Sequence, residues 1–339
     1  MQTLHDERCK ETDRAFSMLQ EKFTKHFQEI FLNDLAEKTV VIIPSLTLNS
    51  EMLKTIKGVI HYEERLLCLL MLLRMPRTQV IYLSSVPIDS SIIDYYLHLL
   101  PGITGYHARQ RLTLLSCYDA SRKSLTEKIL NRPRLIKRIK EHIKFPEMTH
   151  MACFNVTDQE KHLALRLDIP IYGCDPKLLY LGTKSGSRGI FKKLGILVPD
   201  GIENLQNEKD LAAALSQLKR NNPALQKAVV KTNDGFSGEG NAIFYYEELD
   251  ATNENLEAII SDRISQSLKV VAFDVSYEQY MQKFKTIGGV AEEFVNGEYK
   301  ESPSVQCRTN PGGDTVIIST HDQVPVSYTH LTLPTIYSV

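Results

Sequence analysis

The chain has 339 residues, 42% of them hydrophobic and 24% charged, which is enough material for two domains of ordinary size. Its 40 basic and 41 acidic side chains leave a formal net charge of −1, which excludes the broad positive field that binds nucleic acid or an anionic membrane. The densest apolar stretch, residues 66–73, is far shorter than the ~20 residues of a membrane-spanning helix.

The first half of the chain alternates between short apolar runs and amphipathic stretches. Apolar residues at three- and four-residue steps from Ala15 to Ile30 predict an N-terminal helix. The β-branched runs that follow predict strands at 39–44, 79–84, 111–116, 151–155 and 169–172, separated by helices. This alternation predicts a Rossmann-like α/β domain with a mostly parallel sheet, which we expect to end near residue 175.

The second half has a different pattern. Helices are predicted at 185–194, 208–219, 256–265 and 277–284, and strands at 228–232, 241–246, 289–295, 304–308 and 315–320. Strands that follow one another along the chain favour antiparallel pairing, so we expect an α+β domain here.

The last 16 residues, 324–339, contain no Asp, Glu, Lys or Arg. Their Thr and Tyr content would permit a natural terminal strand. The portion SYTHLTLPTIYSV, however, resembles the translated read-through of a sequencing adapter, and we interpret the tail as non-native.

The six cysteines are dispersed and show no C-x-x-C pair or zinc-ligand spacing. They predict reduced thiols, and hence a cytoplasmic protein. The charged N-terminus lacks the apolar region of a secretory signal. We therefore expect neither nucleic acid nor membrane as a partner, and the sequence leaves homo-oligomer formation open.

A glycine-rich loop is the most informative feature for function. Three glycines, Gly235, Gly238 and Gly240, follow a strand that carries Lys231 near its end. Glycines let backbone amides approach a phosphate closely, and a lysine supplies a point charge for its oxygens. The loop is neither a Walker A loop nor the G-x-G-x-x-G of a dinucleotide-binding fold. By itself it is equally consistent with a flexible hairpin.

Two flanking segments narrow the interpretation. Residues 182–185 (GTKS) precede a helix that ends in LGILVP at 194–199, and residues 288–298 (GGVAEEFVNGE) form a strand with paired carboxylates. In this order the three segments resemble the ATP-grasp ligases. The first half adds motifs similar to a pre-ATP-grasp domain, at 61–67 (HYEERLL), 94–97 (DYYL), 99–102 (LLPG), 107–109 (HAR) and 131–135 (NRPRL).

The resemblance covers about residues 38–323 and is to the pheganomycin-type peptide ligases and the related domains of the animal IQ-domain-containing protein H. Together with the N-terminal periodicity and the adapter-like tail, it divides the chain into four parts: an N-terminal helix (1–36), a pre-ATP-grasp domain (37–175), a partial ATP-grasp domain (176–323) and the non-native tail (324–339). We expect the chain to be a C-terminally truncated piece of its parent protein.

The resemblance also assigns roles to residues. Those expected to contact ATP are Lys184 and Lys231 at the phosphates, Gly235, Ser237, Gly238 and Gly240 in the closing loop, Glu292, Glu293, Phe294 and Val295 at the adenine hinge, and Glu298 at the ribose. Either Glu292 or Glu293 could face the base. Arg308 would face the phosphates on a late strand, or else form an ordinary surface ion pair.

ATP-grasp catalysis also implies Mg²⁺, held by an acidic residue and an E-x-N on late strands. After Arg308 the only carboxylates are Asp314 and Asp322, and no E-x-N follows. The sequence thus predicts a parent protein that is an ATP-dependent carboxylate-amine ligase, with this chain an inactive fragment that lacks the metal ligands. Its substrates would be small carboxylates and amines or peptides. The alternative is a non-catalytic nucleotide-binding or interaction module.

Overall fold

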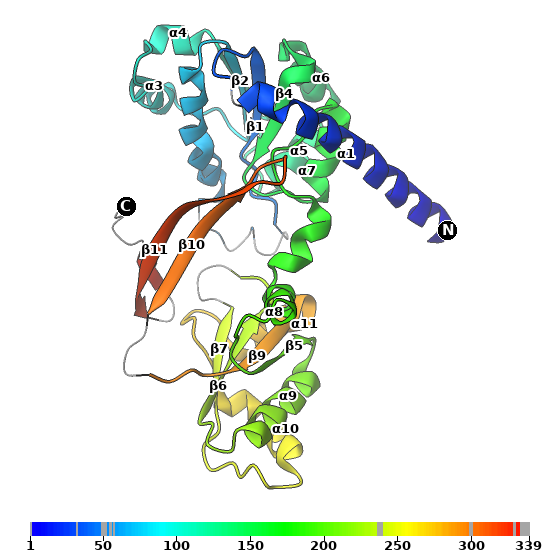
Figure 1. Ribbon diagram of the computed structural model, residues 1–339, viewed down its shortest axis with the longest axis vertical. Coiled ribbons are helices and arrows are strands. Elements are labelled where there is room, and N and C mark those ends of the chain that lie inside the picture. The colour runs from blue at the N-terminus through cyan, green and yellow to red at the C-terminus, as the bar shows by residue number, and fades with distance from the viewer. Residues whose placement is uncertain are drawn as a thin grey trace. The chain divides into compact units, whose positions relative to one another are not determined.

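The computed structural model describes residues 2–31, 33–48, 53, 56, 58–235, 240–297, 301–327 and 330–332. The chain divides into two compact units (Figure 1). Unit 1 comprises Met1–Pro176 and Thr309–Thr315, and unit 2 comprises Lys177–Arg308 and Val316–Val339. Among the described residues, none of the helices is both long and apolar enough to cross a bilayer.

Unit 1 is built on a four-stranded parallel sheet, which confirms the predicted α/β class. Its strands are β1 (Lys38–Ile43), β2 (Thr78–Ser84), β3 (Leu112–Ser116) and β4 (Thr149–Cys153), in the order β3-β2-β1-β4. The register places Val41 of β1 beside Ile81 of β2 and Met151 of β4. All six residues of β1 are buried, as expected for a central parallel strand that is covered on both faces.

The strand predicted at 169–172 was wrong in extent. Only one parallel bridge, Met151 to Ile171, forms outside the named strands there. Pro170 lies inside the segment and has no N–H to donate, which prevents a regular ladder. Its carbonyl oxygen accepts the Met151 N–H at 2.7 Å instead.

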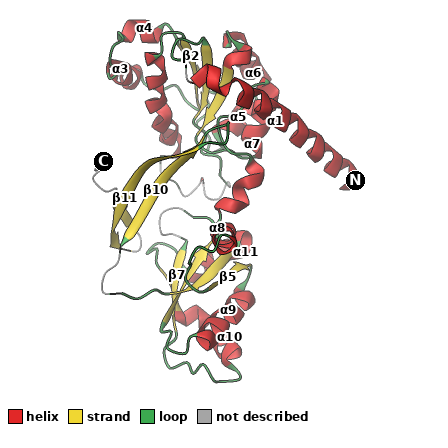
Figure 2. Cartoon of the chain, in the orientation of Figure 1, coloured by secondary structure: helices red, strands yellow, loops and turns green. Residues whose placement is uncertain are grey.

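Helices cover both faces of the unit 1 sheet (Figure 2). On one face pack η1 (Val59–Arg74, a 3₁₀ helix), α3 (Ser90–His98) and α4 (Gly105–Arg109). On the other face pack α1 (Gln2–Phe31), α5 (Leu125–Leu130), α6 (Pro133–His142) and α7 (Asp158–Leu167). A short 3₁₀ turn, η2 (Pro146–Met148), leads into β4.

The N-terminal helix α1 packs through a stripe that differs slightly from the predicted one. Phe16, Leu19, Phe23 and Phe27 are buried, whereas Ala15 is exposed. The burial of Phe16 instead of Ala15 is expected, because the larger side chain removes more apolar area from water. The Phe23 ring stacks on His150 at a centroid distance of 5.3 Å.

Unit 2 contains a five-stranded antiparallel sheet in the order β5-β9-β6-β7-β8. The strands are β5 (Gly201–Leu205), β6 (Lys227–Thr232), β7 (Asn241–Tyr245), β8 (Leu268–Val270) and β9 (Gly289–Glu293). The sequence predicted the three central strands but neither edge strand. Strand β8 has only three residues, which is too short to give a recognisable sequence pattern. Strand β5 pairs irregularly, since its register with β9 shifts after Ile202.

Three helices cover one face of this sheet and one helix lies on the other. The core is formed with α9 (Glu208–Asn221), α10 (Leu256–Ser267) and α11 (Tyr277–Ile287), which pack on Ala228, Val230 and Ala291. Helix α8 (Lys184–Lys193) follows the 3₁₀ turn η3 (Pro176–Gly182) and contacts β5 and β9. Its side chains contact those side chains of the sheet that point away from the core.

A separate three-stranded sheet contains β10 (Ser302–Thr309), β11 (Thr315–Ser327) and β12 (His330–Thr332). The turn between β10 and β11 is closed by the Asn310 N–H, which donates to Asp314 O at 2.9 Å. Residues 328–329 and 333–339 of the suspected tail lie outside the described residues. The predicted four-part division of the chain stays a prediction.

Burial of His150 makes the stability of unit 1 sensitive to acid. Burial, assisted by the charge of Lys38, lowers the pKa of His150 from 6.5 to about 3. The folded protein therefore keeps this ring neutral while the unfolded chain takes up a proton as the pH falls below 6.5. The free energy of unfolding should decrease progressively between pH 6.5 and about 3, and His150→Gln should flatten that decrease in urea unfolding experiments.

The exposed His142 at the end of α6 provides the control for this prediction. His142→Gln should keep the pH dependence of the wild-type protein. If His150→Gln keeps it as well, His150 is not the group that titrates.

Candidate nucleotide site

Asn233, the first residue after β6, joins three segments of unit 2. Its carbonyl oxygen accepts the Lys184 N–H at 3.2 Å, and its Oδ1 accepts the Ser185 N–H at 3.0 Å. Its own N–H donates to Gly288 O at 2.9 Å, and its Nδ2 donates to Ile287 O at 3.0 Å. The first turn of α8 is thus fixed beside the end of β6 and the start of β9.

Gly288 is required where these segments meet. Its φ of +70° lies in the region that favours glycine. A Cβ at this position would lie 2.7 Å from Gln206 Nε2, 2.9 Å from Leu205 O and 3.0 Å from Asn233 Nδ2. Any side chain here would push Asn233 away from α8, so the glycine permits the junction.

Lys231 and Glu292 form an ion pair on the face of the sheet opposite the core. The register sets Lys231 against Val290 and Glu292 against Val229, which makes the two charged residues diagonal neighbours on adjacent strands. The Lys231 Nζ contacts Glu292 Oε2, and Arg188 Nη1 of α8 lies 2.5 Å from Glu292 Oε1. One carboxylate therefore binds two cations, one from β6 and one from α8.

A second carboxylate extends this network. Arg188 Nε lies 2.8 Å from Glu203 Oε1, and Lys192 Nζ lies 2.6 Å from the same oxygen. Partial burial opposes the ionisation of Glu203, but hydrogen bonds and charges from Lys192 and Arg188 lower its pKa below the ordinary value. Glu203 is therefore a carboxylate at neutral pH.

The two ends of the glycine-rich loop meet at the end of β6. The Thr232 N–H donates to Gly240 O at 2.8 Å, and Thr232 Oγ1 donates to Asp234 O at 2.8 Å. A Cβ on Gly235 would lie 3.4 Å from Gly240, so the base of the loop is narrow. Ser237 and Gly238 lie outside the described residues. The structure brings Gly235, Gly240 and Lys231 together.

The predicted hinge residues divide between the two faces of the sheet, as expected for consecutive residues of a strand. Glu292 is buried beside Lys231. Glu293 is half-buried, and its Oε1 accepts the Asp200 N–H at 3.3 Å. Phe294 follows β9, and its N–H donates to Lys227 O at 3.1 Å. The predicted ribose contact, Glu298, lies outside the described residues.

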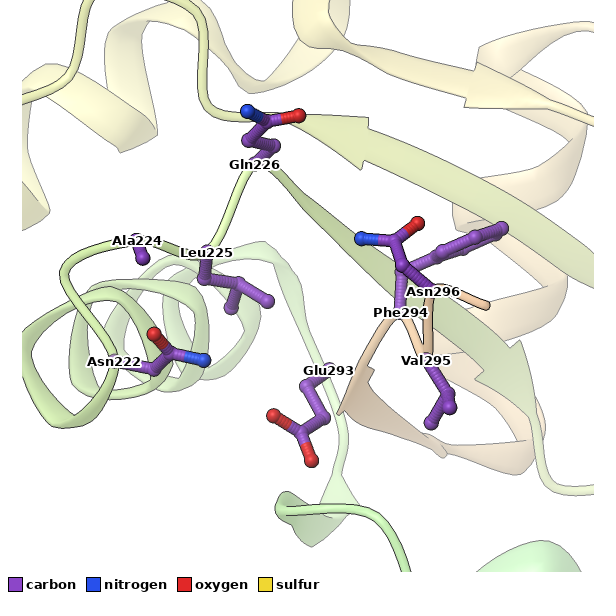
Figure 3. Close-up of a pocket in the computed structure, with 8 residues that line it drawn as sticks. All are labelled: Asn222, Ala224, Leu225, Gln226, Glu293, Phe294, Val295 and Asn296. Atoms are coloured by element: carbon purple, nitrogen blue, oxygen red, sulfur yellow. The ribbon is translucent and has the colours of Figure 1, made fainter. Parts of the chain in front are cut away.

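A hollow of about 420 Å³ lies beside the segment that follows β9. Figure 3 shows its lining, which comes from the connection between α9 and β6 and from that segment: Asn222, Ala224, Leu225, Gln226, Glu293, Phe294, Val295 and Asn296. Neither Lys184 nor Lys231 lines it. The hollow and the lysines are therefore distinct features of unit 2.

Among the described residues, no contact links Arg308 to Lys184 or Lys231. It lies exposed on β10, in the three-stranded sheet, and takes no part in the ion pairs found among these residues. Its predicted role at the phosphates stays a prediction.

A metal site made of protein side chains alone is absent from the described residues. No three side chains of His, Cys, Asp or Glu gather among them in a way that could hold a metal ion. Asp314 hydrogen-bonds Asn310 in the turn after β10, with its Oδ2 3.1 Å from Asn310 Nδ2.

Sequence reasoning missed Asn233, Arg188 and Glu203. A signal for Arg188 was present, since the side of α8 that becomes buried carries Ser185, Gly186 and Arg188 in place of apolar residues. A helix with a polar buried side needs polar partners opposite it. The sequence contains no information about which distant residues those partners are.

Comparison with known proteins finds similar sequences. Residues 177–267 match the family model described as IQCH-like, ATP-grasp. The resemblance inferred from the motifs is thereby confirmed.

Two curated relatives are similar along most of the chain. IQ motif-containing protein H of Danio rerio is 24% identical in an alignment of length 334, and the match covers 85% of this chain and 31% of that protein. L-propargylglycine–L-glutamate ligase of Streptantibioticus cattleyicolor is 24% identical in an alignment of length 295, and the match covers 84% of this chain and 58% of that protein. The chain thus spans less than two thirds of either relative.

Solved structures with a similar chain trace include the ADP complex of PurK, N5-carboxyaminoimidazole ribonucleotide synthetase, with a TM-score of 0.46 and 14% identity. That match covers 88% of this chain and 56% of PurK. D-alanyl-alanine synthetase A of Vibrio cholerae gives a TM-score of 0.39 at 12% identity, over 86% of this chain and 68% of that chain.

Asn233 should be a stability determinant of unit 2. Asn233→Ala removes the hydrogen bonds to the Ser185 N–H and Ile287 O, and the loss should lower the free energy of unfolding by about 1–3 kcal/mol in urea titrations. Asn253→Ala is the matched control, because Asn253 Oδ1 accepts only the Asn255 N–H in an exposed loop. Equal losses in the two variants would contradict the junction role of Asn233.

Proposed function

We propose that the chain supplies the nucleotide-binding residues of an ATP-dependent carboxylate-amine ligase. The observation that carries the proposal is the meeting of α8, β6 and β9 at Asn233, which places Lys184, Lys231 and the base of the glycine-rich loop in one region. The segment that matches the IQCH-like ATP-grasp model contains both lysines and the glycine-rich loop, whereas β9 lies outside it. One relative of the chain is named as a ligase of two amino acids.

In the proposed reaction, ATP transfers its γ-phosphoryl group to a substrate carboxylate, which gives an acyl phosphate and ADP. The nitrogen of an amine then attacks the acyl carbon, phosphate leaves, and an amide forms. The contribution of this chain is positioning and charge. Lys231 would neutralise phosphate oxygens, and the backbone N–H groups of Gly235 and Gly240 would bind them.

The proposed partners are ATP, a small carboxylate, and an amine or peptide. The five cysteines with described side chains are free thiols, which supports a reducing, cytoplasmic setting. We also propose that this chain alone turns over little substrate, because no E-x-N segment follows Arg308 to hold the Mg²⁺ that the chemistry needs.

A non-catalytic nucleotide-binding module is the second candidate. It is favoured by the same lack of a metal-binding group among the described residues and by the similarity to IQ motif-containing protein H. Such a module would bind ATP without releasing ADP.

Lys231 tests the nucleotide site. Lys231→Met should weaken ATP binding about tenfold to hundredfold, because a phosphate loses a charge-assisted hydrogen bond. Isothermal titration calorimetry measures the change. Lys209→Met, on an exposed position of α9, should bind ATP as the wild-type chain does. Equal affinity of wild type and Lys231→Met would mean that the phosphates lie elsewhere.

Hydroxylamine trapping tests the reaction. With ATP, Mg²⁺ and a panel of amino acids including L-propargylglycine and L-glutamate, a parent protein that forms an acyl phosphate should yield a hydroxamate and ADP. The present chain should yield little of either. ATP binding by the parent protein without ADP release for any carboxylate would support the module instead.

A further inference from the structure

Arg188 is buried and makes contacts from every nitrogen of its guanidinium group. Its side chain is only 6% exposed. Nη1 binds Glu292 Oε1 at 2.5 Å, Nε binds Glu203 Oε1 at 2.8 Å, and Nη2 donates to Pro199 O at 2.8 Å. Because three separate acceptors fix a planar group, its orientation is fully determined.

The backbone of β5 makes room for this group. Gly201 pairs with Glu292 across the β5–β9 ladder. A Cβ at Gly201 would lie 2.7 Å from Arg188 Nη2 and 2.8 Å from Ala291 O. The glycine thus allows the guanidinium to lie flat over the strand beside the carboxylate that it binds.

The Glu292 carboxylate is held in place and cannot move with the Lys231 side chain. Its Oε1 is bound to Arg188, so the position of its Oε2 is set, and the Lys231 Nζ contacts that oxygen. The Lys231 side chain is 32% exposed and thus reaches solvent. A lysine side chain is flexible, and it is this contact that gives its ammonium group a defined position.

We propose that Arg188 is a positioning residue that acts through Glu292 on Lys231, and so sets where the ammonium group meets a phosphate. The inference rests on the proposed nucleotide site. When a phosphate attracts the Lys231 ammonium, Arg188 keeps Glu292 paired, so no buried carboxylate is left without a cation.

Attachment of α8 does not by itself explain Arg188. The first turn of the helix is already held by Asn233, through the N–H groups of Lys184 and Ser185. A buried ion pair contributes little net stability, since desolvation offsets the attraction. Without Arg188, Glu292 would lose the contact that fixes its position.

A double-mutant cycle on phosphate binding tests the proposal. Wild type, Arg188→Met, Lys231→Met and the double variant are titrated with ATP and with inorganic tripolyphosphate, which lacks the base. Each single change should weaken tripolyphosphate binding about tenfold, because Lys231→Met removes the ammonium group and Arg188→Met removes its fixed position. In the Lys231→Met background the additional loss from Arg188→Met should be less than about twofold.

A merely structural role predicts a different result. Arg188→Met would then weaken tripolyphosphate binding by the same factor with and without Lys231, and the proposal would be wrong. Arg263→Met, at an exposed position of α10, is the control and should change neither ligand's affinity. If the wild-type chain binds neither ATP nor tripolyphosphate, the proposed nucleotide site fails and this inference fails with it.

If circular dichroism shows that Arg188→Met does not fold, Arg188→Lys takes its place in the experiment. A lysine keeps the charge but cannot hold Glu292, Glu203 and Pro199 O at once. The same cycle with Arg188→Lys should again show weaker tripolyphosphate binding that depends on Lys231. Full affinity in a folded Arg188→Lys variant would overturn the proposal.

Discussion

One buried carboxylate, Glu292, connects the elements from which the candidate site is built. It lies on β9 and binds Lys231 of β6 and Arg188 of α8, and Arg188 in turn binds Glu203 of β5. An unpaired carboxylate at this depth would cost several kcal/mol. The positions of these three strands and of α8 are therefore mutually dependent, and the lysine at the end of β6 is placed by all of them.

The sequence predicted the elements of the site better than their connections. Short β-branched runs between amphipathic stretches identified the parallel sheet of unit 1, because burial on both faces leaves a clear pattern. Lys184 and Lys231 were singled out by the segments around them, and their contact with ATP stays a prediction. Arg188 was not singled out, because its partner Glu292 lies 104 residues away. Pairing over such a separation depends on strand register, which the pattern of one strand does not contain.

The paired carboxylates illustrate what register adds. The sequence left open which of Glu292 and Glu293 would face a bound base. Consecutive residues of a strand point to opposite faces, so both cannot do so. Only the ladder with β6 determines which face carries Lys231, and it gives that face to Glu292. Glu293 instead accepts the Asp200 N–H and lines the hollow beside the segment after β9.

Helix α8 is attached to the sheet at two points, which have different roles. Asn233 holds its first turn through the backbone N–H groups of Lys184 and Ser185, so that junction does not use the Lys184 side chain. Arg188, one turn later, binds Glu292, which contacts Lys231, and also binds Glu203, which contacts Lys192. A site whose cation is already positioned loses less conformational entropy when a phosphate binds. Under the proposed function, this gain offsets the cost of burying Arg188 and Glu292 together.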